Sequence, residues 1–262
     1  MKLFLIKEAL VEALKTFPFL LGIYLVVEYF ESNFRYQRRL GPIIGALLGA
    51  IPQCGFSILT TGFYLAGRTT LGTLLAVYLA TSDEALPILL AYPDKIKFIF
   101  PLVFFKVIYA AVVGLIIDLL FPHNQLTPRS SVKTESACCG QHQSFSFHPL
   151  IHALKLTGYI FGLNLILGWI FELFHPTVLL NPFSAAIIGL IPNCAASVFL
   201  TEAFLKNVIS FGSLFAGLCA SAGLGLFLLF KESDSYHRSF VILALLYIFS
   251  VLGGFMIQSI LG

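Results

Sequence analysis

Charged residues are scarce in this 262-residue chain. Lys, Arg, Asp and Glu make up 11% of it, whereas 58% of the residues are hydrophobic, and the mean hydropathy is +0.92. So few polar side chains cannot cover the surface of a large soluble core, and this excludes an ordinary soluble domain. The formal net charge of +3 is small, so no nucleic-acid partner is expected.

Three further signals are missing. The odd number of cysteines, five, argues against a disulfide framework. The sequence holds neither a Walker pattern nor a kinase-like Gly-rich loop, so ATP use is not expected, and no cofactor is expected either. No cleavable signal peptide is evident, because the first sixteen residues carry too many charges for its apolar core: Lys2, Lys7, Glu8, Glu12 and Lys15.

Long apolar runs are abundant. Most of them reach the roughly 20 residues that a helix needs to cross the hydrocarbon core of a bilayer. The sequence therefore predicts an all-α, multi-pass membrane protein, surrounded by lipid and located in the cell inner membrane. The runs occupy 17–30, 41–66, 72–91, 98–121, 156–174, 182–205, 211–230 and 239–261.

One stretch of the sequence occurs twice, at an offset of 140 positions. Ile51-Pro52-Gln53-Cys54-Gly55-Phe56-Ser57 returns as Ile191-Pro192-Asn193-Cys194-Ala195-Ala196-Ser197, and the offset also aligns Pro42 with Pro182, Gly49 with Gly189 and Gly72 with Gly212. We therefore predict one structural unit in two copies, each with a first helix, a Pro-interrupted segment and two further helices. The expected division is repeat 1 at 1–121, a polar linker at 122–149 and repeat 2 at 150–262.

The prolines interrupt the repeated segments. Pro52 and Pro192 lack a backbone N–H and clash with the preceding helical turn, so a helix that reaches them breaks or kinks. Backbone freed at membrane depth must be satisfied by protein or by a hydrated cavity. Transporters place substrate sites where such interrupted helices of two repeats meet.

The path of 41–66 decides the topology. If this segment enters the membrane and returns, the two repeats are inverted; Arg68 then shares a side with Lys231 and Arg238, and Lys95 shares the other with Lys206. If it crosses fully, Lys95 and Arg68 exchange sides. The distribution of basic residues favours the inverted, re-entrant arrangement.

Each interruption carries an amide, a thiol and hydroxyls. Thiols suit soft ions such as trivalent arsenic, cadmium, zinc and copper(I), so these groups are candidate substrate ligands. The alternative is a plain Pro kink, with Cys as a small apolar residue and the hydroxyls bonded back within their own helices. The candidates are Gln53, Cys54, Ser57, Thr61, Asn193, Cys194, Ser197 and Thr201.

Asp83, Glu84 and Glu202 are carboxylates in apolar runs that have no acidic counterpart in the other repeat. An ionisable group inside a bilayer usually serves a cation or a proton, so these are candidates for ion coupling. The alternative places Asp83 and Glu84 at a helix end near lipid headgroups, or pairs them with Lys106.

The linker holds a weaker candidate, a soft-metal site formed by Cys138, Cys139, His142 and His148. Their spacing matches no standard zinc motif, so a plain solvated linker is the competing interpretation.

At its paired motifs the chain resembles the ten-helix heavy-metal exporters, an arsenic-efflux family in which some members carry the name of manganese transporters. The resemblance extends over nearly the whole chain and implies transport. It rests on 51–57 and 189–197, together with 72–85 and 216–226.

These features predict a secondary transporter that exports a heavy metal or metalloid of the arsenic type, coupled to protons. A carrier for manganese or another hard divalent cation would instead use Asp83 and Glu84. A passive channel is a further alternative, and a homo-oligomer stays open. Catalysis is not expected, because all six histidines lie in or near loops, away from Cys54 and Cys194.

Overall fold

The computed structural model describes residues 41–51, 55–81, 85–121, 181–192, 194–232 and 236–261. The chain divides into two compact units, and all described residues belong to the one formed by Tyr36–Pro128 and Thr177–Gly262. The other unit comprises Met1–Arg35 and Arg129–Pro176. The expected helices at 17–30 and 156–174 and the linker at 122–149 therefore lie outside the described residues.

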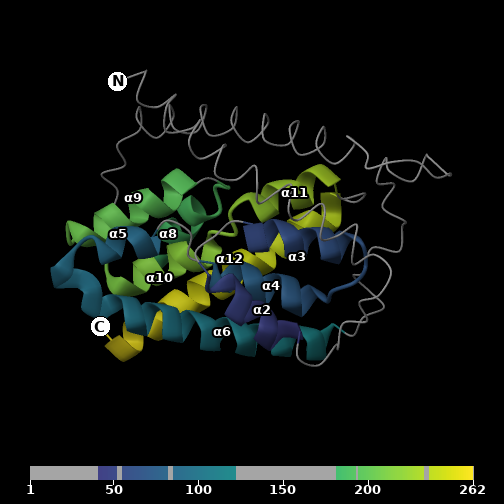
Figure 1. The fold of residues 1–262 in the computed structure, drawn as a ribbon, viewed down its shortest axis with the longest axis horizontal. Helices are drawn as coiled ribbons and strands as arrows, with labels where there is room; N and C mark the ends of the chain where they lie inside the picture. The colour runs from purple at the N-terminus through teal and green to yellow at the C-terminus, as the bar shows by residue number, and fades with distance from the viewer. Residues whose placement is uncertain are drawn as a thin grey trace, which may run out of the picture. The chain divides into compact units, whose positions relative to one another are not determined.

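The described part of the chain is helical and contains no strand (Figure 1). Its first half comprises α2 (Gly41–Gly49), α3 (Gly55–Leu65), α4 (Leu71–Ala80), α5 (Ala85–Leu90), the 3-10 helix η1 (Pro93–Phe98) and α6 (Ile99–Leu120). Its second half comprises α8 (Pro182–Gly189), α9 (Cys194–Leu205), α10 (Phe211–Ala220), α11 (Leu224–Glu232) and α12 (Tyr236–Leu261).

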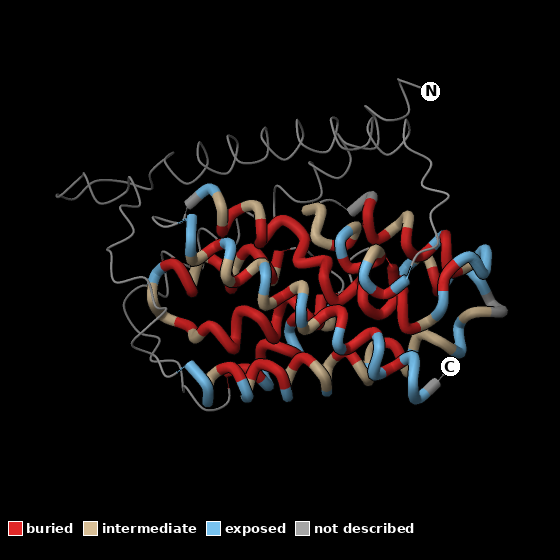
Figure 2. Tube along the Cα trace, turned by 180° about the vertical axis from the view of Figure 1, so that it is seen from behind, coloured by how far each residue is buried: buried red, intermediate tan, exposed pale blue. Residues whose placement is uncertain are grey.

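Among the residues that the structure describes, four stretches are long and apolar enough to cross a membrane. In an 18-residue window of each, 80% of the residues of Leu71–Leu90 and 83% of those of Phe211–Lys231 are buried, against 28% for Lys95–Leu120 and 39% for Tyr236–Ile260. The first two are therefore central, and α6 and α12 flank them (Figure 2). The exposed side chains of α6 and α12 include Phe100, Phe104, Leu252 and Phe255. An apolar outer surface of this kind is suited to lipid and not to water.

The apolar runs at 72–91 and 211–230 correspond to two of these stretches, and each contains a break between two helices. α4 ends at Ala80 and α5 begins at Ala85, while α10 ends at Ala220 and α11 begins at Leu224. Thr81 leaves the helical conformation with φ −59° and ψ 132°, and Gly223 has a φ of 58°, in the left-handed region that favours glycine. Each half thus has a second interruption that hydropathy did not reveal.

The close packing of α2 on α4 shows in which direction the segment that contains α2 and α3 runs. A Cβ atom built on Gly45 would lie 3.2 Å from the Thr73 carbonyl oxygen, and one built on Gly49 would lie 2.7 Å from that of Val77. The contacts advance together along both helices, so α2 and α4 run in the same direction. α3 leads into α4 through only a few residues, because Leu65 ends one helix and Leu71 begins the other. The segment that contains α2 and α3 therefore begins and ends at the same end of this unit.

In the second half, the residues at the offset of 140 make the equivalent helix contacts. Gly189 packs against the backbone of Gly217, as Gly49 does against Val77. Gly212 at the start of α10 packs against Gly254 of α12, as Gly72 at the start of α4 does against Gly114 of α6. The helix caps correspond as well: the N–H of Thr73 donates to Thr70 Oγ1, and the N–H of Ser213 donates to Ser210 Oγ.

α4 and α10 begin at opposite ends of α6. Gly72 lies near the C-terminal end of α6, where its N–H donates to Asp118 Oδ1 at 2.8 Å. Phe211 lies at the other end, where its ring centroid is 5.6 Å from that of Phe98. The 22 residues of α6 span about 33 Å, so the starts of α4 and α10 are far apart and the two helices run in opposite directions.

Hydrogen bonds at several points join the two halves. The Tyr109 hydroxyl of α6 donates to the Phe249 carbonyl of α12. At the end of the unit where α10 begins, Lys95 Nζ donates to Asn207 Oδ1 at 2.9 Å. Lys95 therefore lies beside Asn207, the residue after Lys206. α3, after which the chain continues to Arg68, packs against α11, which contains Lys231.

Candidate functional site

Short helices from opposite halves pair with one another. α3 packs against α11, and α5 packs against α9 (Figure 1). α3 and α11 approach each other closely at Gly225, where an added Cβ would lie 2.7 Å from the Ser57 carbonyl oxygen. The start of α3, which follows the interruption at Pro52, thus contacts the start of α11, which follows the break between α10 and α11.

The hydroxyls expected on α3 are inside this contact. Ser57 and Thr61 are both fully buried. Thr61 Oγ1 donates to the Ser57 carbonyl at 2.6 Å, lies 2.6 Å from the Tyr78 hydroxyl, and lies 3.3 Å from the Gly225 carbonyl. This one side chain therefore joins α3 to α4 and to the start of α11.

The corresponding hydroxyls of α9 are buried too. Ser197 and Thr201 are 1% and 0% exposed, and Thr201 Oγ1 donates to the Ser197 carbonyl at 2.7 Å. Thr61 and Thr201 thus both bond back within their own helices, as the structural interpretation of these residues expects. Only the Thr61 hydroxyl is also within hydrogen-bonding distance of groups outside its helix in the described contacts.

The amides and thiols cannot be placed in the same way. Gln53, Cys54 and Asn193 lie outside the described residues, and so does the side chain of Cys194, the first residue of α9. Of the described residues beside them, Gly55 and Ala196 are buried, Pro192 is partly buried and Ile51 is exposed.

The carboxylates divide into two groups. Asp83 and Glu84 lie outside the described residues, but they are flanked by Thr81 and Ala85, which are 1% and 0% exposed. Glu202 is on the surface of α9, where it pairs with Lys206 at 3.3 Å and its side chain is about half exposed. The structure therefore does not bring Glu202 to the buried hydroxyls of its own helix.

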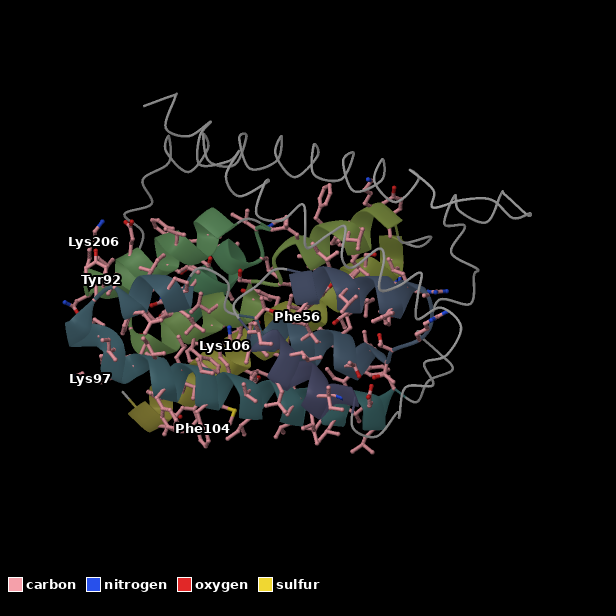
Figure 3. The ribbon with its side chains drawn as sticks, viewed as in Figure 1. Phe56, Tyr92, Lys97, Phe104, Lys106 and Lys206 are labelled. Atoms are coloured by element: carbon pink, nitrogen blue, oxygen red, sulfur yellow. The ribbon has the colours of Figure 1, made fainter. Side chains whose placement is uncertain are left out.

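From the sequence, Lys106 was expected only as a possible partner for Asp83 and Glu84. This side chain is 1% exposed, and its Nζ donates to the Thr81 carbonyl and, at 2.9 Å, to the Leu218 carbonyl (Figure 3). A lysine at the centre of a membrane helix costs about 2.5–3.5 kcal/mol on insertion scales, so it needs such partners. A lone lysine well inside a long apolar run was the sequence signal for this position.

Within the described residues, no three His, Cys, Asp or Glu side chains gather as a metal site. Cys219, one residue after Leu218, is a buried free thiol. The linker candidates Cys138, Cys139, His142 and His148 lie outside the described residues.

The long apolar spans, the lipid-type surface of the flanking helices and the buried polar groups between the halves define a multi-pass helical membrane protein. A family model described as "Putative, 10TM heavy-metal exporter" (ArsP_2) matches residues 16–178 and 168–262. The chain belongs to this family, which confirms the resemblance seen in the paired motifs. The family is one of exporters and not a class of enzymes. No curated protein and no solved structure matches the chain.

Proposed function

We propose that this protein is a secondary transporter that exports a heavy metal or metalloid of the arsenic type across the cell inner membrane. The observation that carries the proposal is the pairing of short helices across the halves, α3 with α11 and α5 with α9. The first pair encloses the Thr61 hydroxyl, and α9 of the second pair carries the buried hydroxyls of Ser197 and Thr201. Interrupted helices with polar groups at membrane depth are how many secondary transporters build substrate sites.

We further propose that the halves are inverted repeats with re-entrant Pro-interrupted segments. Three observations support this arrangement: the shared offset of the helix contacts, the opposite directions of α4 and α10, and the return of the α2–α3 segment to the end where it began. The bond from Lys95 to Asn207 favours it as well, because full crossing would separate Lys95 from Lys206. Inverted repeats allow one site to open alternately to either face.

The substrate ligands in this proposal are the duplicated polar groups. The amides and thiols at the interruptions would contact the ion, and Ser57 and Ser197 would lie one turn further along α3 and α9. Thr61 and Thr201 support those serines, since both bond to the serine carbonyls. Thiols favour soft ions over hard ones.

Proton coupling is assigned to Asp83 and Glu84. Both follow the end of α4 between two buried residues, a position where a carboxylate is costly unless it binds a proton or a cation. Glu202 is the weaker candidate because of its surface ion pair with Lys206. A manganese carrier is the second candidate function, and it would use the same two carboxylates as hard ligands.

The test is a sensitivity panel in a host that lacks its own exporters, with arsenite, arsenate, manganese, zinc, cadmium and cobalt. Wild type is compared with the Cys54→Ser, Cys194→Ser double variant, and Cys219→Ser is the matched control for replacing a buried thiol. We expect the double variant to lose protection against soft ions about tenfold or more, and the control to protect like wild type. Full protection by the double variant would contradict thiol ligation.

Uphill transport in sealed vesicles separates a carrier from a passive channel. Wild type should accumulate the ion against its gradient when a proton gradient is imposed, and Asp83→Asn should not. Accumulation that is equal in the two proteins would remove Asp83 from the coupling mechanism. Downhill flux alone, with no accumulation by wild type, would indicate a channel.

A further inference from the structure

Two helix ends converge on the Lys106 ammonium. Thr81 is the C-cap residue of α4, and Leu218 lies in the last turn of α10. The last carbonyls of a helix have no partner within the helix and carry the negative end of its dipole. The ammonium therefore occupies a point lined by carbonyls from the C-terminal ends of two helices, one from each half.

The backbone around Leu218 is arranged so that its carbonyl can serve this contact. α10 ends at Ala220, and the next N–H that could have continued the helix, that of Ala222, donates to the Ala220 carbonyl at 2.9 Å. The Leu218 carbonyl is thereby left for Lys106. Without a cation, two partial negative charges would face each other in a buried region.

Only one half supplies this charge. The position equivalent to Lys106 at the offset of 140 is Leu246 of α12, which is also fully buried. A lysine needed only to fill space could be a leucine in both halves. The charge at Lys106 therefore calls for an explanation beyond packing.

We propose that the Lys106 ammonium is a resident cation: it fills a carbonyl-lined cation site between the halves, and transport depends on this positive charge. The protein thus carries its own counter-charge at the ends of α4 and α10 and needs no inorganic cation bound there. This inference rests on the proposed function for its transport consequence, but the cation site itself does not depend on it.

The experiment uses purified full-length protein in detergent and in vesicles. Lys106→Ala retains Cβ, and n-propylammonium supplies the three carbons and the ammonium that are lost; n-propanol is the neutral control. We expect n-propylammonium to raise the melting temperature of Lys106→Ala by about 3 °C, and n-propanol not to raise it. Leu246→Ala, the matched truncation of the equivalent buried side chain, should respond to neither compound.

Transport is measured in the same preparations with the ion that wild type exports. Lys106→Met fills the space without charge and should lose transport, whereas Lys106→Arg should keep part of it. n-Propylammonium should restore transport by Lys106→Ala at least in part. Neither Lys106→Met nor Leu246→Ala should be rescued by it.

Two results would overturn the inference. One is a melting temperature of Lys106→Ala that n-propylammonium does not change, which would mean that no cation site exists. The other is full transport by Lys106→Met, which would mean that the charge is dispensable, and this comparison remains decisive if Lys106→Ala does not fold. Failure of wild type to transport any ion of the panel would instead refute the proposed function and leave the melting-temperature test intact.

Discussion

Gly225→Ala is expected to weaken the contact between α3 and α11. The new Cβ would lie 2.7, 2.8 and 2.9 Å from the carbonyl oxygen, carbonyl carbon and Cβ of Ser57. None of these atoms can rotate away, because all three belong to the backbone of α3 or are attached directly to it. The two helices must therefore separate by several tenths of an ångström.

The magnitude follows from two opposing terms. Overpacking of this kind costs about 1–3 kcal/mol, and replacing Gly by Ala in a helix returns up to about 1 kcal/mol. Mid-range values of the two terms give a net loss in the free energy of unfolding of about 1–2 kcal/mol. Gly62→Ala is the matched control in α3, because nothing lies within 4 Å of its added Cβ; it should gain about 0.5–1 kcal/mol.

Thermal unfolding of the two variants in one detergent measures the difference. At about 2–4 °C per kcal/mol, Gly225→Ala should melt below wild type and Gly62→Ala at or slightly above it. A Gly225→Ala protein that is as stable as Gly62→Ala would refute the close approach of the helices. Loss of transport by Gly225→Ala alone would further link this contact to function.

Three other changes test the described contacts. Thr61→Val removes a hydroxyl shared by α3, α4 and α11 and should lower the free energy of unfolding by about 1–3 kcal/mol. Thr201→Val should lower it less in the same denaturation assay. Equal losses would contradict the contacts of the Thr61 hydroxyl with α4 and α11. Asp118→Ala removes the carboxylate that accepts from the Gly72 N–H and, at 2.7 Å, from the Thr70 hydroxyl. It should lower the free energy of unfolding by about 1–2 kcal/mol. Gln258→Ala, at the exposed position 140 residues later, should stay within about 0.5 kcal/mol of wild type. Glu202→Gln should leave the pH profile of transport in vesicles unchanged, because its ion pair is a surface pair; a displaced profile would return Glu202 to the coupling residues.

The sequence predicted those features of the fold that depend on one segment or on the repeat, but not the second interruption in each half. The membrane class followed from the apolar runs, because a span of about 20 residues is a property of each segment by itself. The glycines at Gly49 and Gly72 and their partners at the offset of 140 were visible as identities, and the structure gives them a reason: each lies where another backbone is too close for a Cβ. The second interruptions were missed because hydropathy averaged over a span-length window stays high around Thr81 and Gly223, even though Thr81–Glu84 is itself polar.

The partners across the halves could not have been predicted from the sequence. Nothing in the sequence near Ser57 states that Gly225 packs against it, since such pairings depend on how two separate segments cross. Lys106 was visible as a charge in an apolar run, but its role depends on which carbonyls it reaches. Those carbonyls belong to the ends of two helices that hydropathy had read as continuous.

The hydrogen bond from Tyr109 to Phe249 joins two residues that are 140 positions apart. In the proposed repeats, each of these residues is the counterpart of the other, so their contact lies on the axis that relates the two copies. Points on such an axis keep their positions when the copies exchange conformations. In the proposed transporter, we therefore expect the Tyr109–Phe249 contact to persist while the contacts farther along α6 and α12 change.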